Sequence, residues 1–206
     1  MSSKENILEA AIELFAEKGK HGTRMEEIAA RAQINKAMVY YYYTSKDYLF
    51  EEVLKYIVQS VYVSIYRALE NVSQDNDDPV MVVKVFLMAH FQAFINQKNF
   101  TKILLDAHTD EPEQIRTAFE SMAMDWEKNI PQEMLDTFQR GVEQRLFRDI
   151  NYKHVMISII GMNLIYYFNK PIAQAQLNLK VDNEQQFLLE RIESNIDLLF
   201  NGILVK

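Results

Sequence analysis

A pair of short helical segments, residues 25–32 and 36–43, constrains the fold of this chain more than any other feature. A turn of three to four residues separates them. Thr23 begins a Thr-x-x-Glu pattern with Glu26, which is typical of a capping box at the start of a helix. Asn35 is a favourable N-cap for the second segment. Two short helices joined by so tight a turn have the spacing of a helix-turn-helix motif.

Longer helical segments are expected on both sides of this motif. Apolar residues recur at helical spacing over residues 7–15. Gly19 follows at a point where the C-terminus of a helix needs a left-handed residue. Ser45 is placed to cap a long helix that runs from Lys46 to about Val72. We therefore expect residues 1–48 to form a three-helix domain that contains the helix-turn-helix.

The remainder of the chain is also predicted to be helical. Only 5 Gly and 4 Pro occur among 206 residues, so helix-breaking residues are scarce. Further helices are expected at about residues 80–97, 100–108, 112–129, 132–147, 152–169 and 184–203. About nine helices and no convincing strand predict an all-α fold, in which residues 49–206 form a larger helical domain. The absence of cysteine excludes disulfides and thiolate metal sites.

The charge of the chain is distributed unevenly. Its net charge is −7, yet residues 1–50 hold seven basic and seven acidic residues, so the whole excess lies in residues 51–206. Between Lys18 and Lys46 there are six Lys or Arg and only two Glu. A small basic module attached to an acidic body is the pattern expected of a DNA-binding domain whose partner domain repels DNA.

The second segment of the motif has the properties of a recognition helix. Its four consecutive tyrosines, Tyr40–Tyr43, point all round the helix axis and cannot all be buried. Packing demands fall on Ile28, Ala29, Ile34 and Val39. The other side chains of the second segment are then free to face the major groove. There a tyrosine hydroxyl can donate to a phosphate oxygen, and the ring can cover a thymine methyl.

Residues 7–54 resemble the N-terminal domain of the TetR family of transcription regulators. The likeness is carried by ILEAAIELF at residues 7–15, by Gly19, by IAARA at residues 28–32 and by VYYYYTSKDYL at residues 39–49. It implies a cytoplasmic, ligand-responsive bacterial repressor. Three positions depart from the family pattern: Gln33 replaces a turn glycine, Arg24 replaces a Ser or Thr, and Met38 replaces a small polar residue.

The resemblance also implies which residues contact DNA. We expect contacts from Thr23, Arg24, Met25, Lys36, Ala37, Met38, Tyr40, Tyr41, Tyr42 and Lys46. Tyr40 could equally be a packing residue that touches phosphate, and Lys36 and Lys46 could be ordinary surface lysines. Tyr43 fills a family position that is usually buried, so we expect it in the core. Sequence discrimination is expected from Lys36, Ala37 and Met38.

One recognition helix contacts too few base pairs for useful specificity, so a homodimer on a palindromic double-stranded DNA operator is expected. The resemblance implies a four-helix bundle made from the last two helices of each copy. The predicted interface residues are Val155, Ser158, Ile159, Met162, Tyr166, Ile192, Ile196, Leu199, Phe200 and Ile203. The alternative is that these apolar stripes fill the core of the monomer.

The family also encloses a mostly apolar pocket for a small-molecule effector among its middle helices. Our candidates for its lining are Phe86, His90, Phe94, His108, Met122, Trp126 and Tyr167, each of which could instead be core. Bound effector would shift the population towards a state in which the helix from Lys46 to Val72 separates the recognition helices. A metal site at His90, His108 and Asp110 is considered and not expected, and no cofactor is implied.

Other classes of function are less well supported. No Ser/His/Asp, Cys/His, paired-carboxylate or Gly-rich phosphate pattern stands out, so an enzyme or lipid carrier built as a helical bundle is not expected. No secretion signal occurs, and the apolar stretch at residues 155–168 is shorter than a bilayer requires, so membrane association is not expected and a cytoplasmic location is. A protein partner in place of the small ligand remains an alternative.

Overall fold

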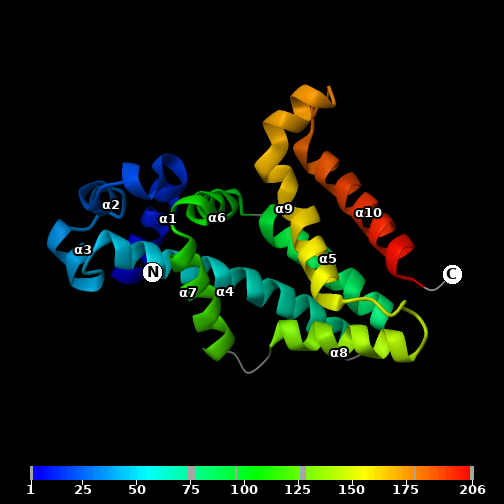
Figure 1. Cartoon of the computed structure of the whole chain (residues 1–206). Helices are drawn as coiled ribbons and strands as arrows, with labels where there is room; N and C mark the ends of the chain where they lie inside the picture. Colours follow the sequence, from blue (N-terminus) through cyan, green and yellow to red (C-terminus); the bar gives the residue numbers. More distant parts are fainter. Residues whose placement is uncertain (1, 74–77, 96, 126–128, 179, 205–206) are drawn as a thin grey trace. The chain divides into compact units, whose positions relative to one another are not determined.

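Helices make up nearly all of the chain. The computed structural model describes residues 2–73, 78–95, 97–125, 129–178 and 180–204 (Figure 1). These residues contain ten helices and one isolated β-bridge, between Phe147 and Leu204, so the predicted all-α class is confirmed. The helices divide between two compact units, residues 1–60 with 97–126 and residues 61–96 with 127–206.

Unit 1 contains the helix-turn-helix. Its helices are α1 (Ser3–Gly22), α2 (Met25–Arg31), α3 (Lys36–Tyr42), the first part of α4 (Lys46–Ser73), α6 (Lys98–Asp110) and α7 (Pro112–Asp125). A capping box of Ser2 and Glu5 begins α1, and Gly19, with a φ of 70°, interrupts its helical geometry as predicted. The core of the motif contains Ile7, Phe15, Ile28, Val39 and Leu49, all at most 2% exposed.

The division into units does not fall at the predicted boundary between residues 48 and 49. Residues 49–60 and helices α6 and α7 belong to the same unit as the helix-turn-helix, and α1 packs against α6. Lys20 of α1 is 8% exposed and pairs with Glu111, which lies between α6 and α7, at 2.6 Å. Whether residues 1–48 act as a separate functional domain therefore stays a prediction.

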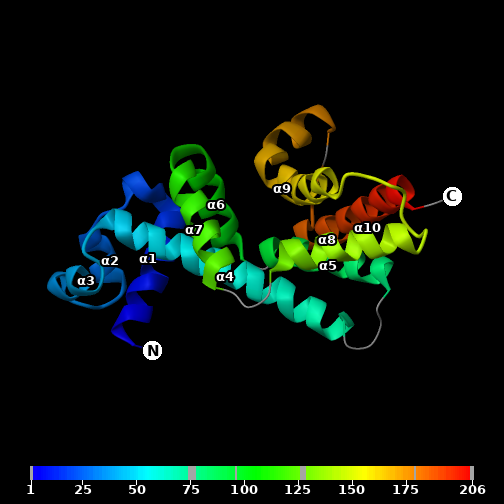
Figure 2. The same ribbon diagram turned by 60° about the horizontal axis from the view of Figure 1, so that its bottom comes forward.

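Unit 2 is built around α5 (Pro79–Ile95). This helix contacts α8 (Ile130–Glu143), α9 (Tyr152–Gln176) and α10 (Glu184–Ile203), as Figures 1 and 2 show. Ten residues of α5 are buried, on more than one face, which is expected of a helix that is apolar all round. In the described part of the chain no single helix is long and apolar enough to cross a membrane, and only α5 and α6 taken as a bent pair meet that test.

Candidate nucleic-acid interface

The turn of the motif contains a non-glycine residue in a left-handed conformation. Gln33 adopts a φ of 56°, so it occupies a left-handed position that glycine normally favours. The Ile34 amide donates to the Ala29 carbonyl at 3.0 Å. Asn35 then caps α3, as predicted, because its side chain accepts from the Met38 amide at 2.8 Å. These local bonds fix the direction in which α3 leaves α2.

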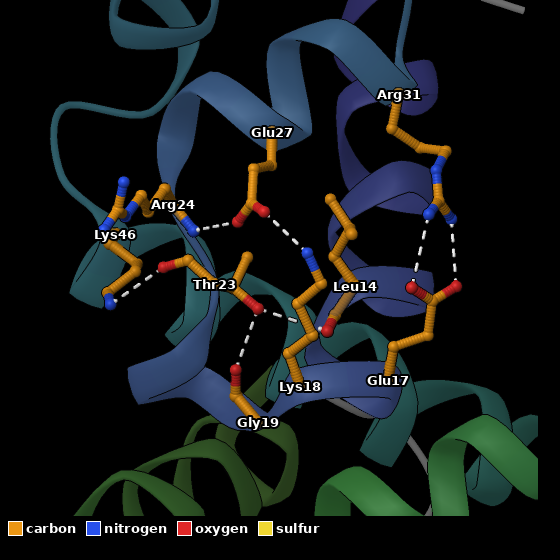
Figure 3. A network of polar contacts seen from close by, with 9 residues as sticks. All are labelled: Leu14, Glu17, Lys18, Gly19, Thr23, Arg24, Glu27, Arg31 and Lys46. Carbon is orange, nitrogen blue, oxygen red and sulfur yellow. Dashed lines mark hydrogen bonds and ion pairs between the residues drawn. The ribbon is translucent and has the colours of Figure 1, made fainter.

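The start of α2 differs from the prediction by one residue. Arg24, not Thr23, is the N-cap, and the Glu27 carboxylate accepts from the Arg24 amide at 2.9 Å. The Thr23 hydroxyl instead donates within the fold, to the carbonyls of Gly19 at 2.8 Å and Leu14 at 3.1 Å (Figure 3). Thr23 is 0% exposed. The predicted Thr23–Glu26 capping box and the predicted DNA contact by the Thr23 side chain are both wrong.

Met25 must also be removed from the predicted DNA surface. Its side chain is buried, because it is the first residue of α2 and points into the core beside Ile28 and Ala29. Arg24, directly before it, is exposed. Of the three residues predicted at the start of α2, only Arg24 therefore has a side chain open to a partner.

The outer face of α3 is exposed and aromatic. Tyr41 is 77% exposed, Tyr40 41% and Met38 37%, and both Lys36 and Ala37 are exposed as well. Tyr42 is half-buried, with its ring edge-on to Tyr41 at 5.2 Å between centroids. Tyr43 is 1% exposed, which confirms its predicted place in the core. We call Lys36, Ala37, Met38, Tyr40 and Tyr41 the α3 face.

The two lysines beside the α3 face have partners that the sequence did not reveal. Lys36 pairs with Glu26 of α2 at 2.5 Å, and that hydrogen bond raises the pKa of Lys36. Lys46 donates to the backbone carbonyl of Thr23 at 3.0 Å, which ties the start of α4 to the start of α2 (Figure 3). The Lys46 side chain remains half-exposed. A sequence signal existed for Lys36 alone, since its charge is opposite to that of Glu26.

Unit 2 places the predicted dimer residues on two different sides of their helices. Most are core: Ile159, Tyr166, Ile192, Leu199, Phe200 and Ile203 are all at most 7% exposed. These six side chains pack inside their own unit, which agrees with the alternative of a monomer core, and their part in a dimer interface stays a prediction. Ser158 is exposed, and Val155, Met162 and Ile196 are half-buried.

The exposed side of α9 is also apolar, and of its residues only Ser158 was among the predicted interface residues. Its exposed residues include Ile157 (67%), Ile160 (39%), Ile165 (45%) and Ile172 (53%), together with Ser158 and Gly161. Residues 155–169 contain no charged side chain. We call Ile157, Ser158, Ile160, Gly161 and Ile165 the α9 face. Apolar residues on every side of this helix were the available signal.

The predicted pocket residues also fall into separate groups. Phe86, His90 and Phe94 are buried along α5, and Tyr167 of α9 lies in the same unit with a buried hydroxyl. Met122 is buried in unit 1, whereas His108 is exposed, which contradicts its predicted place in a pocket lining. Trp126 lies outside the described residues. Within the described ranges there is no group of three His, Asp or Glu able to hold a metal ion.

Comparison with known proteins relates this geometry to a family. Residues 7–53 match the model for bacterial regulatory proteins of the tetR family. The HTH-type transcriptional regulator YerO of Bacillus subtilis is 26% identical over 98% of this chain and 67% of its own length. The HTH-type transcriptional repressor NicS of Pseudomonas putida is 28% identical, over 81% of this chain and 76% of its own length.

Solved structures share the fold over nearly the whole chain. A TetR family transcription regulator from Marinobacter aquaeolei superposes with a TM-score of 0.69 at 15% identity, covering 99% of this chain and 96% of that one. The family match in the helix-turn-helix, the relatives that extend beyond it and the common fold agree. Residues 7–53 therefore carry the DNA-binding domain of the tetR family, and over most of its length the chain is similar to HTH-type transcriptional regulators.

Proposed function

We propose that this chain is a homodimeric repressor that binds a palindromic operator through the α3 face and leaves it when a small molecule binds unit 2. The observation that carries the DNA-binding part is the α3 face itself. Tyr41 is 77% exposed on a helix whose other side is fixed in the core by Val39 and Tyr43. A rigidly held, exposed aromatic and basic surface is suited to the major groove.

The roles within this surface follow from side-chain chemistry. Tyr41 and Tyr42 hold phosphates and thymine methyls, while Lys36, Ala37 and Met38 discriminate bases. Arg24 and Lys46, together at the start of α2 and α4, bind phosphate. Tyr40 has a shared role, because the Lys36 ammonium lies 5.7 Å from its ring centroid and both side chains are exposed. The chain would act in the cytoplasm, where bacterial DNA lies.

The α9 face supports the homodimer. A stripe of isoleucines without charge is costly to leave in water, and Gly161 and Ser158 are small enough to let a second helix approach closely. A Cβ placed on Gly161 meets no atom of the described residues within 4 Å, so no described side chain covers this position. A two-fold pairing of this face is the proposed dimer contact.

Repression and ligand release are supported by the relatives. NicS is named a transcriptional repressor, and family members are typically ligand-responsive. The buried Phe86, His90, Phe94 and Tyr167 are the proposed lining of the effector site. A partner protein in place of the small ligand is the second candidate, but no observation favours it. The relatives are named as regulators, and we propose no enzymatic activity.

Selection from random double-stranded DNA with the full chain tests this proposal. The expected result is enrichment of one sequence with two-fold symmetry. A changed base preference in a Met38→Ala variant that folds normally would assign the reading of bases to α3. Enrichment of an asymmetric sequence, or none at all, would contradict the dimeric repressor.

A further inference from the structure

A small group of polar side chains lies in the apolar core of unit 2, where α5 contacts α9. Asn163 is 1% exposed and His90 is 7% exposed, and the hydroxyl oxygen of Tyr167 is buried. The imidazole of His90 lies between two aromatic rings, 6.0 Å from Phe86 and 5.1 Å from Phe94 between centroids. We call His90, Asn163 and Tyr167 the polar cluster.

Hydrogen bonds fix the orientation of Asn163 within the polar cluster. Its amide nitrogen donates to the Leu87 carbonyl at 3.3 Å and lies 3.0 Å from Nδ1 of His90. The opposite orientation would place the amide oxygen against the Leu87 carbonyl, where two acceptors repel. Nδ1 of His90 is therefore the acceptor, and the proton of the neutral ring is on Nε2. Burial lowers the pKa of His90 to about 4, in agreement with a neutral ring.

Two atoms of the polar cluster have no hydrogen-bond partner among the described residues. They are Oδ1 of Asn163 and the hydroxyl of Tyr167. A buried polar atom without a partner costs about 1–3 kcal/mol, so folded proteins seldom keep one without a use. Asn163 and Tyr167 are four residues apart and share a face of α9. An acceptor and a hydroxyl thus lie on one helix face inside an apolar core.

None of the three side chains of the polar cluster carries a charge, which favours an uncharged partner. Lys170 is paired with Glu184, and Arg191 donates from Nη2 to the Met162 carbonyl at 3.0 Å. An ionised carboxylate would be repelled by Oδ1 of Asn163 and would find no positive charge on the neutral His90 with which to pair. The Arg191 guanidinium is the group to which a carboxylate ligand would bind instead, because its Nε has no hydrogen-bond partner among the described residues.

From these contacts we propose that the polar cluster binds an uncharged, largely apolar organic molecule that carries a hydrogen-bond donor beside an acceptor, as an aryl carboxamide does. The donor pairs with Oδ1 of Asn163, and the acceptor receives the Tyr167 hydroxyl. The aromatic rings of Phe86 and Phe94 cover the apolar body. This inference rests on the proposed function, because it names the chemical class of the effector.

Matched probes test the inference on the full chain. Benzamide and 2-naphthamide are compared with benzoate, 2-naphthoate, toluene and 2-methylnaphthalene by ligand-observed NMR, with calorimetry for those that bind. The carboxamides are expected to bind most tightly. Tyr167→Phe and Asn163→Leu are each expected to weaken carboxamide binding by about 10-fold, the value of one hydrogen bond. Tyr152→Phe removes a hydroxyl from the same helix and is expected to change nothing.

Folding and binding are separated by the variants themselves. Tyr167→Phe removes an unpaired hydroxyl, so its thermal unfolding temperature should equal or exceed that of the original chain. Tighter binding of the carboxylates, failure of every carboxamide to bind, or unchanged carboxamide binding in both variants would overturn the inference.

DNA release is measured separately. Carboxamides that bind at the polar cluster without lowering DNA affinity would contradict the proposed ligand control of DNA binding but leave the ligand class standing. If a carboxylate released DNA equally well from the original chain and from Asn163→Leu, ligand control of DNA binding would be supported and the proposed ligand class contradicted.

Discussion

The helix-turn-helix and unit 2 treat their buried polar groups in opposite ways. In the helix-turn-helix, the buried Thr23 hydroxyl has two carbonyl acceptors, and the buried Lys20 pairs with Glu111 and Asp47. In unit 2, Asn163 and Tyr167 each keep a buried atom without a partner among the described residues. The buried polar groups of the helix-turn-helix find their hydrogen-bond partners within the chain, whereas unit 2 has buried polar atoms to which a ligand could bond.

The exposed surfaces show the same contrast. The α3 face is aromatic and basic and is suited to solvent or DNA, whereas the α9 face is aliphatic and uncharged. A surface of the second kind is stable when covered by another apolar surface. The helix-turn-helix thus completes its buried hydrogen bonds and exposes a polar aromatic surface, while unit 2 keeps unpartnered buried atoms and an exposed apolar face.

Gly161→Arg should have the largest effect. No atom of the residues that the structure describes lies within 4 Å of a Cβ placed there, so the monomer should fold normally. In a two-fold interface both copies would bury an unpaired charge, and dimerisation should weaken at least about 1000-fold. Sedimentation equilibrium measures this. Gly202→Arg, at an equally open glycine of α10, is the matched control. An unchanged dimer in Gly161→Arg would show that the α9 face is not the interface.

The contrast between buried Lys20 and buried His90 predicts a pH dependence. Burial disfavours the Lys20 ammonium, but hydrogen bonds to Glu111 and Asp47 outweigh it and raise the pKa of Lys20. Among the described residues His90 has no such acid partner, and burial lowers its pKa from 6.5 to about 4. The unfolded chain therefore binds a proton at His90 that the folded chain does not, between these two values.

The His90 contribution is complete above pH 6.5 and is lost as the pH falls towards 4, by about 3 kcal/mol in the free energy of unfolding. The free energy of unfolding, measured by urea denaturation at several pH values between 4 and 7, should rise less steeply with pH in His90→Gln than in the original chain. His154→Gln, at an exposed histidine, is the control. Equal slopes in His90→Gln and the original chain would mean that His90 is not buried in its neutral form.

Tyr41→Ala tests the α3 face. Because its side chain is 77% exposed, the free energy of unfolding should change little, while DNA affinity should fall about 10- to 100-fold through two lost phosphate contacts per dimer. Fluorescence anisotropy on the selected operator measures the loss. Tyr41→Phe removes the hydroxyl and keeps the ring, so it shows which of the two groups contributes the affinity. Full affinity in Tyr41→Ala would remove this residue from the interface.

Lys46→Met should weaken binding to every DNA sequence alike. The slope of log K against log salt concentration should become shallower by about 0.9 for each chain, because one phosphate contact is lost. Lys46→Arg should restore the slope. A change in base preference at an unchanged salt slope would show that Lys46 reads bases instead.

Glu26→Gln should have the smallest effect, in the opposite direction. It releases Lys36 from an exposed ion pair, which is worth little to stability. DNA affinity should rise a few-fold, and adding Lys36→Met should cancel the gain. A fall in affinity would mean that Glu26 orients Lys36 on the DNA.

Prediction from sequence succeeded where bonds are local. The Asn35 and Ser45 caps and the left-handed Gly19 all depend on neighbours within a few residues. The start of α2 was wrong by one residue because the Thr23 hydroxyl finds acceptors in the preceding helix, which a local motif does not specify.

Longer-range features could not be predicted in the same way. Apolar residues surround α9, so periodicity cannot separate its core side at Ile159 from its exposed side at Ile157. Likewise, the polar cluster depends on His90 and Asn163, which are 73 residues apart. Their contact is set by helix packing alone, and Asn163 was not among the predicted residues.

The stoichiometry of the chain on its selected operator tests the central claim most directly. Analytical ultracentrifugation can compare one duplex with two half-sites and a matched duplex in which one half-site is scrambled. Two chains should bind each full site, and scrambling one half-site should lower affinity at least about 100-fold. One chain per duplex, or equal affinity for both, would contradict a dimer that reads DNA through two α3 faces.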